Sequence, residues 1–223
     1  MLLPAAISFT ATLAPEVQPG RALPRLLILG CAACLLPASA QAHTALQGVG
    51  SFWSGVAHLL TSLDQLGFLL GLAIWTSFQD RRLDARVIAV ASGAALAGVW
   101  TGLGIGGVAR IDLAAAAAAL MIVVGLAGAL RLRGRIAVVL GLTALGGIIG
   151  GAAGADATSG LSVTLFSLGA AIATASVLSY GLLAARRLEA EWGGIARRAG
   201  ASWIAAIGLM VLALSFARRG GPI

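Results

Sequence analysis

The chain has 223 residues, a formal net charge of +7 and a mean hydropathy of +0.98, and 59% of its residues are hydrophobic while only 10% are charged. A soluble domain carries about 25% charged residues, so this composition excludes a soluble globular protein and indicates a polytopic membrane protein. Every positive side chain is an arginine, and the arginines cluster in short segments between apolar runs. This distribution is typical of topology control, and it does not form the basic face with interleaved aromatic residues that nucleic-acid binding would need.

Residues 1–42 have the features of a secretory signal peptide. Arg21 and Arg25 supply the positive charge, an apolar stretch follows, and the small residues of AQA (40–42) form a cleavage site. The sequence therefore predicts a mature chain of residues 43–223. Two alternatives stay open: a start codon placed too early, and a lipoprotein-type cleavage at Cys31, although the apolar run before Cys31 has only about five residues.

Cleavage after residue 42 would have two consequences for metal chemistry. It would remove Cys31 and Cys34, so the mature chain would contain neither a disulfide nor a thiolate ligand. It would also place His43 at the new N-terminus, where a free amine beside an imidazole forms a bidentate pair for a late transition metal. The alternative for His43 is an exposed histidine in a flexible tail.

Six apolar segments follow, each close to the length of about 20 residues that a transmembrane helix needs. They cover residues 52–78, 87–108, 113–130, 136–154, 161–185 and 200–217. The sequence thus predicts an all-α polytopic bundle of about six transmembrane helices after a cleaved signal peptide. The segments 80–86 and 185–198 are expected to be loops, and Gly-xxx-Gly spacings in the apolar segments indicate closely packed helices.

The arginines predict the orientation of the bundle. The loops after the first, third and fifth spans contain ten of them, and arginine-rich loops stay in the cytoplasm. We therefore expect a multi-pass protein of the bacterial inner membrane with a periplasmic mature N-terminus. Six spans would place the C-terminus outside as well, whereas Arg218 and Arg219 favour a cytoplasmic tail, which would follow if the fourth or sixth span did not cross fully.

The first span, residues 52–78, carries the candidate functional residues. His58, Asp64 and Gln65 lie inside it, and Asp64 falls near its centre, where an ionisable group is costly unless it is functional. On a straight helix five polar residues of this span fall within one stripe: Ser54, His58, Thr61, Ser62 and Gln65.

Asp64 lies outside that stripe, about 120° around the helix from His58 and nearer Thr61, so one straight helix cannot chelate an ion with both. Three arrangements would still allow both residues to contact an ion. The helix opens locally, each residue meets partners on other helices, or the two residues bind the ion one after the other. The alternative is a stripe that hydrogen-bonds neighbouring helices. Since no nucleophile–base pair, phosphate loop or dinucleotide fingerprint is present in the sequence, we expect no enzymatic activity.

Two stretches of the chain resemble motifs of the HupE/UreJ family of small membrane proteins, which is associated with nickel or cobalt uptake. HLLTSLDQ (58–65) is similar to the HxxxxxDH motif of the first mature helix, with Gln65 in place of the second histidine. IIGGAAGAD (148–156) fits the frame of a later FHGxAHGxE motif, with Asp156 in place of the glutamate and Ile149 and Ala153 in place of the histidines. The signal peptide ending before His43 also fits.

The resemblance implies a permease for Ni²⁺ or Co²⁺ that carries the ion as cargo and binds no tight cofactor. His43 would capture the ion, His58 and Asp64 would form the intramembrane station, and Gln65, Thr61 and Asp156 would add polar contacts. The loss of three motif histidines leaves oxygen donors, which suit nickel less well than nitrogen does. The alternatives are a scaffold that acts as an assembly partner or homo-oligomer in a membrane complex, and transport of protons or a small solute.

Overall fold

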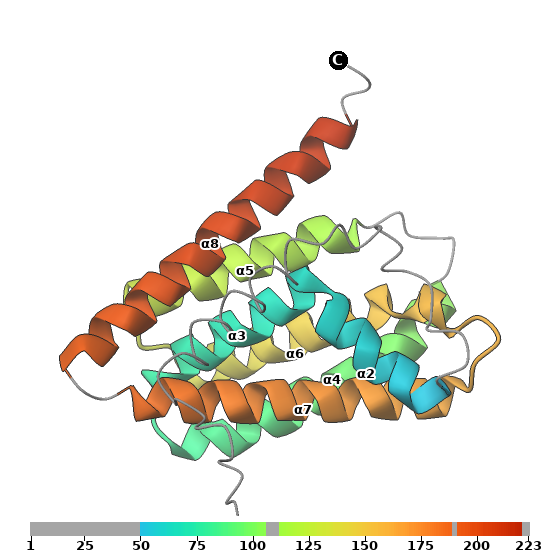
Figure 1. The fold of residues 1–223 in the computed structure, drawn as a ribbon, viewed down its shortest axis with the longest axis horizontal. Helices are drawn as coiled ribbons and strands as arrows, with labels where there is room; N and C mark the ends of the chain where they lie inside the picture. Colours follow the sequence, from blue (N-terminus) through green and yellow to red (C-terminus); the bar gives the residue numbers. More distant parts are fainter. Residues whose placement is uncertain (1–49, 106–111, 189–190, 220–223) are drawn as a thin grey trace, which may run out of the picture. The chain divides into compact units, whose positions relative to one another are not determined.

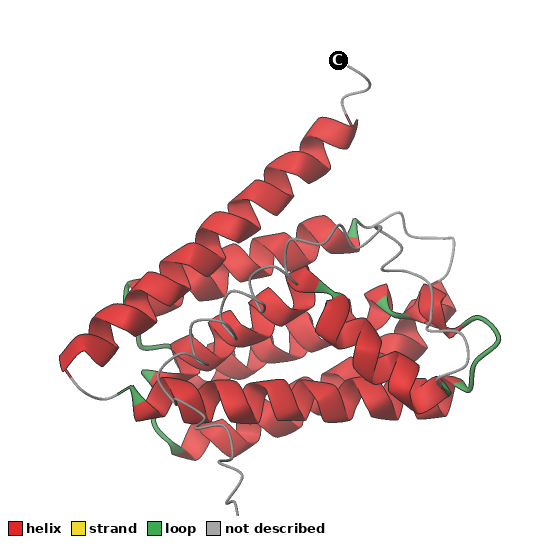
Figure 2. Ribbon diagram, in the orientation of Figure 1, coloured by secondary structure: helices red, strands yellow, loops and turns green. Residues whose placement is uncertain are grey.

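A computed structural model describes residues 50–105, 112–188 and 191–219 of the chain, and every regular element in these ranges is helical (Figures 1 and 2). The predicted signal peptide and His43 lie outside the described residues. The elements are α2 (Ser51–Thr61), α3 (Leu63–Ser77), α4 (Arg82–Ile105), α5 (Leu113–Ala129), α6 (Ile136–Ala153), a 3₁₀ turn η1 (Ala155–Thr158), α7 (Val163–Arg187) and α8 (Glu191–Arg219). The predicted all-α membrane fold is confirmed.

Each predicted apolar segment corresponds to a helix or a pair of helices. In the described ranges α4, α6, α7 and α8 are long and apolar enough to cross a membrane. The helix α5 is apolar but has only 17 residues. The first segment differs from the prediction, because it is not one helix: α2 and α3 meet at Ser62 with a bend of 72°.

Local hydrogen bonds accompany this bend. Ser62 has an extended backbone (φ −82°, ψ 95°), and its hydroxyl donates to the carbonyl oxygen of His58 at 2.7 Å. The hydroxyl of Thr61 donates to the carbonyl oxygen of Ala57 at 2.8 Å. Hydroxyls that bond backbone carbonyls within the helix compete with the regular ladder and commonly bend helices, so the dipeptide Thr61-Ser62 favours a break at this point.

Two predicted loops are also shorter than expected. The helix α4 begins at Arg82, inside the predicted loop 80–86, and the carboxylate of Asp80 accepts a hydrogen bond from the Arg82 amide at 2.8 Å. The helix α7 continues to Arg187 and α8 begins at Glu191, so most of the predicted loop 185–198 is helical. The reason is that arginine, leucine, glutamate and alanine are all strong helix formers, so a charged segment made of them can still be helical.

The helix α3 lies at the centre of the bundle and contacts each of the other helices (Figure 1). Around it α4 packs on α6, α5 on α8, and α2 on α7. The buried core between them includes Phe68 and Leu72 of α3, Val124 of α5 and Leu178 of α7. Glycines permit the closest approaches, as the Gly-xxx-Gly spacings predicted: a Cβ on Gly151 of α6 would meet backbone atoms of α4.

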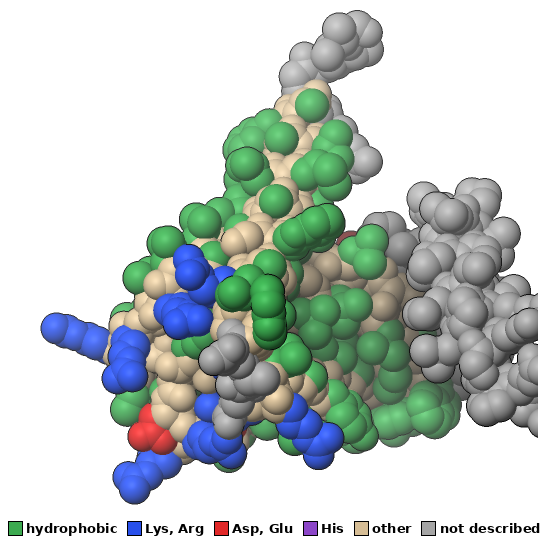
Figure 3. All heavy atoms as spheres, turned by 60° about the vertical axis from the view of Figure 1, so that its left-hand side comes forward, with side chains coloured by type: hydrophobic (Ala, Val, Ile, Leu, Met, Phe, Trp, Pro, Cys, Tyr) green, Lys and Arg blue, Asp and Glu red, His purple; other side chains and the backbone are tan. Residues whose placement is uncertain are grey.

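The ten arginines in or next to the connections α3–α4, α5–α6 and α7–α8 gather at one end of the bundle, which we call the arginine end (Figure 3). There α3, α5 and α7 end, and α4, α6 and α8 begin. The Arg186 guanidinium contacts the Asp84 carboxylate at 2.6 and 2.7 Å and also donates to the Ser77 carbonyl at 3.2 Å. The Arg197 guanidinium lies 4.6 Å from the centre of the Phe78 ring. Polar and cation–π contacts thus join helices that are far apart in the sequence.

Candidate functional site

His58 lies in the last turn of α2 and is 9% exposed. Its ring packs against that of Phe166 on α7, with 5.8 Å between ring centres and a tilt of 47°. This contact depends on Gly55, one turn earlier on α2, because a Cβ at that position would collide with the Phe166 carbonyl oxygen. A glycine therefore lets α2 approach α7 closely enough to bury the imidazole.

Gln65 lies in the first turn of α3, is 7% exposed, and meets both His58 and α6. Its Nε2 donates to the carbonyl oxygen of Gly150 at 2.9 Å and lies 3.4 Å from Nε2 of His58. In a straight helix, seven residues would separate the two Cα atoms by about 10.5 Å along the axis. The bend at Ser62 opens the helix between them, so that both side chains face one point.

Gly150 of α6 and Gly154, which caps the C-terminus of α6, pack against these two side chains. A Cβ on Gly154 would lie 3.0 Å from Cδ2 and Nε2 of the His58 ring, and a Cβ on Gly150 would lie 3.4 Å from the Gln65 amide. Any larger residue at 154 would press on the imidazole. The stretch 148–156 therefore packs directly on the stretch 58–65, although 85 residues separate Gln65 from Gly150.

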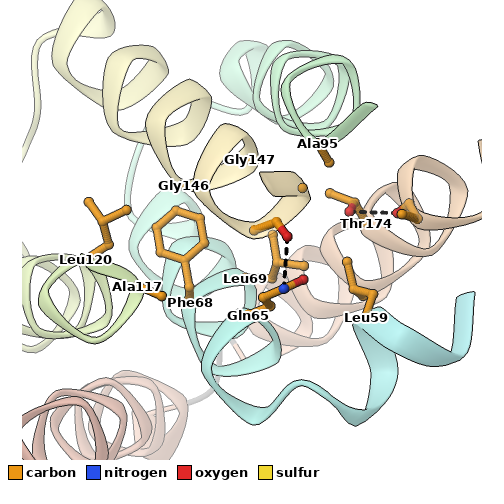
Figure 4. Close-up of a pocket in the computed structure, with 13 residues that line it drawn as sticks. Leu59, Gln65, Phe68, Leu69, Ala95, Ala117, Leu120, Gly146, Gly147 and Thr174 are labelled. Atoms are coloured by element: carbon orange, nitrogen blue, oxygen red, sulfur yellow. Dashed lines mark hydrogen bonds between the residues drawn. The ribbon is translucent and has the colours of Figure 1, made fainter. Parts of the chain in front are cut away.

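A small cavity of about 20 Å³ adjoins Gln65 (Figure 4). Most of its wall is apolar, and it includes Leu59 of α2, Phe68 of α3 and Thr174 of α7. A volume of this size holds about one water molecule. One turn before His58, the buried Ser54 hydroxyl has no hydrogen-bond partner among the described residues. The centre formed by His58 and Gln65 is therefore nearly closed, and Ser54 is a buried, unpaired hydroxyl one turn away on α2.

The structure places the other predicted site residues differently. Asp64 is half-buried in the first turn of α3, and within the described part of the chain it makes no hydrogen bond or ion pair. Thr61 is exposed and uses its hydroxyl on its own helix. Asp156 is exposed in η1, and His43 lies outside the described residues. His58 and Gln65 are thus the predicted residues that the structure brings together.

The site lies away from the arginine end. Gly150 is fifteen residues along α6 from Arg135, which corresponds to about 22 Å. Half of a hydrocarbon core of about 30 Å is about 15 Å, so the site lies in the half of the bundle opposite the arginines. The sequence predicted Asp64 at the midplane of a straight span. Because Asp64 lies next to Gln65 at the start of α3, it also lies in the half of the bundle opposite the arginines.

The donors at this point are one imidazole, one carboxamide and one backbone carbonyl. In residues 50–105, 112–188 and 191–219, no three His, Cys, Asp or Glu side chains form a group that could hold a metal ion. A set with one nitrogen ligand and oxygen donors binds nickel weakly. The arrangement can therefore contact a passing ion, and a tight site would need additional ligands.

Two polar groups at or near the site were not among the predicted site residues. The carbonyl of Gly150 accepts the Gln65 amide, and Ser54 offers an unpaired hydroxyl. Ser54 belongs to the predicted polar stripe, and Gly150 is a matching position of the second motif-like stretch, so both carried a signal in the sequence. Only the fold shows that the two stretches meet.

Comparison with known proteins identifies the family of the chain. Residues 31–211 match the family model described as HupE / UreJ protein. A search of curated proteins and a search of solved structures each gave no match. The family match covers most of the chain, including both stretches that meet at His58 and Gln65. The chain therefore belongs to the HupE/UreJ family of membrane proteins.

Proposed function

We propose that this protein is a permease that moves a divalent transition-metal ion, Ni²⁺ or Co²⁺, into the cell. The family is associated with nickel and cobalt uptake, and one observation carries the proposal to this chain. The two stretches that resemble the family motifs, 58–65 and 148–156, pack together at His58, Gln65 and Gly154. Packing alone would not require an imidazole and a carboxamide side by side at one buried point.

In this proposal the ion enters from the periplasmic side, opposite the arginine end. His43 captures it, and Asp156 attracts it at the outer mouth. His58 and Asp64 form the intramembrane station, and Gln65 and Thr61 offer oxygen atoms. Since the cavity beside Gln65 has a volume of only about 20 Å³, passage of an ion requires the helices to move apart. The hinge at Ser62 is a place where α2 can swing relative to α3.

The orientation belongs to the same proposal. The arginine-rich helix ends face the cytoplasm, and the mature N-terminus begins in the periplasm of a bacterial inner membrane. The structure supports this because arginines from three separate connections gather at a single end of the bundle (Figure 3).

A second candidate function is that of a structural or assembly partner in a membrane complex. The observation that favours it is the hydrogen bond from Gln65 to Gly150, because a side chain that holds two helices together is well suited to a scaffold. The two functions differ in what they require of His58 and Asp64. A permease needs both as metal contacts, whereas a scaffold tolerates polar substitutes.

Nickel and cobalt accumulation in uptake-deficient cells tests the proposal. Cells that express the protein should accumulate the metal, as measured by elemental analysis, and His58→Ala and Asp64→Asn should abolish accumulation. Thr143→Val is the control. Thr143 is a buried polar residue of α6, and its hydroxyl donates to the Val139 carbonyl of the same helix. Immunoblotting of membranes shows whether each variant is present. No accumulation by wild type that is present in the membrane would favour the scaffold instead.

A further inference from the structure

A cleft of about 450 Å³ opens between α4 and α7 at the arginine end. Its lining includes Asp84 and Ile88 of α4 and Leu183 and Arg187 of α7. Ile88 follows Asp84 by one helical turn and Leu183 precedes Arg187 by one turn, so on both helices the charged residue lies nearer the bundle end and the apolar residue lies deeper. The cleft therefore has a polar mouth and an apolar wall.

The mouth of the cleft is positively charged. Three arginines line it, Arg81, Arg186 and Arg187, against one acidic residue, Asp84. Arg186 is engaged with Asp84 through two hydrogen bonds of 2.6 and 2.7 Å, so these two charges offset each other. Arg81 and Arg187 are exposed at the mouth, and Arg187 makes no hydrogen bond or ion pair with the described part of the chain. Arg187 therefore offers a positive charge at the mouth, and the exposed Arg81 lines the same mouth.

We propose that this cleft binds an anionic phospholipid, with the phosphate of its headgroup between Arg81 and Arg187 and an acyl chain along Ile88 and Leu183. Arginine binds phosphate through a fork of N–H donors, and basic pockets between helices at the cytoplasmic surface bind anionic headgroups. Leu183 is 48% exposed, so the apolar wall is open to a chain. On both helices the charged residue lies at the bundle end and the apolar residue lies deeper, in the same order as the charged headgroup and the acyl chain of a lipid. This inference does not depend on metal transport.

Native mass spectrometry of the full-length protein tests the proposal. The protein is purified in detergent with an equimolar mixture of phosphatidylglycerol and phosphatidylcholine, and the lipids that remain bound are counted. We expect preferential retention of phosphatidylglycerol. Arg187→Gln should reduce that preference about five-fold, which corresponds to about 1 kcal/mol for one arginine near a membrane surface. Arg81→Gln should act in the same direction.

Arg133→Gln is the matched control. Arg133 is exposed between α5 and α6 at the same end of the bundle, outside the cleft, and its substitution removes the same charge. The control should retain the wild-type preference. Equal retention of the two lipids, or an equal loss in Arg133→Gln and Arg187→Gln, would overturn the proposal. Thermal shifts provide a second readout: phosphatidylglycerol should raise the unfolding temperature, and an equal rise with inorganic phosphate would assign the cleft to a small anion instead.

Discussion

Gln65 shows how one residue can decide between a metal site and a packing contact. Its amide donates to Gly150 and lies 3.4 Å from the His58 imidazole. Two nitrogen ligands at about 2.0–2.1 Å from a tetrahedral metal lie about 3.4 Å apart. The spacing of the two nitrogens is therefore that of a ligand pair, but a carboxamide nitrogen has no lone pair for a metal. Replacement by histidine would supply one.

We therefore predict that Gln65→His increases the affinity of the purified protein for Ni²⁺ on the order of tenfold, the lower range of effects for groups around a metal. Isothermal titration calorimetry in detergent measures the change. Gln79→His is the control, because Gln79 lies at the arginine end and bonds the Leu132 carbonyl. The same gain in both variants would mean that an added histidine anywhere suffices and that position 65 has no special role.

At the scale of helices, the sequence predicted the elements better than their geometry. Hydropathy located all six apolar segments because each must match the thickness of a bilayer. It could not predict the 72° bend, because the mean hydropathy of residues 52–78 fits one span and the break depends on hydroxyl–carbonyl bonds at Thr61 and Ser62. Local opening of the helix was only one of the arrangements that the sequence allowed. Hydropathy could not predict the contact of Gln65 with Gly150 either, since this contact depends on how α3 and α6 pack.

The seam between α4 and α6 gives a prediction about helix packing. A Cβ on Gly151 would meet the Ala95 carbonyl oxygen and would lie 2.9 Å from the Gly98 Cα atom, and backbone atoms cannot rotate away. Gly151→Ala should therefore lower the free energy of unfolding by about 1–3 kcal/mol. Gly141→Ala adds the same methyl group to the same helix where nothing lies within 4 Å, and should be neutral or stabilising by about 0.5–1 kcal/mol. Thermal unfolding in detergent compares them, and equal unfolding temperatures would contradict the seam.

At the scale of the whole molecule, counting arginines located one end of the bundle but not the interactions made there. The ten arginines of three connections could be assigned to one side of the membrane, because charge bias controls topology. The sequence did not show which arginines make structural contacts, since Arg186 binds Asp84, which is 102 residues away in the chain. Trp75, near the end of α3, makes another such contact: it is buried, and its Nε1 donates to the Leu132 carbonyl, 57 residues away in the chain.

The contacts of Arg186 make it the central link of the arginine end. Its guanidinium donates to the Asp84 carboxylate and to the carbonyl oxygens of Thr76, Ser77 and Gln79, at and just beyond the C-terminus of α3. Carbonyls at that terminus lack intrahelical donors and carry partial negative charge, so a cation there is favourable. The side chains of Arg186 and Asp84 are 12% and 25% exposed, which makes the pair stronger than a fully hydrated one.

We predict that Arg186→Gln lowers the free energy of unfolding by about 2 kcal/mol, within the range for hydrogen bonds to charged groups. Asp84→Asn should cost less, because Arg186 keeps its carbonyl partners. The double variant should cost less than the sum of the two single changes, since the second substitution has no ion pair left to break. Unfolding in mixtures of dodecyl sulfate and mild detergent, followed by circular dichroism, measures all three. Arg82→Gln, an exposed neighbour on α4, should stay within about 0.5 kcal/mol of wild type. Additive effects of Arg186→Gln and Asp84→Asn would show that the pair does not hold α4 to α7.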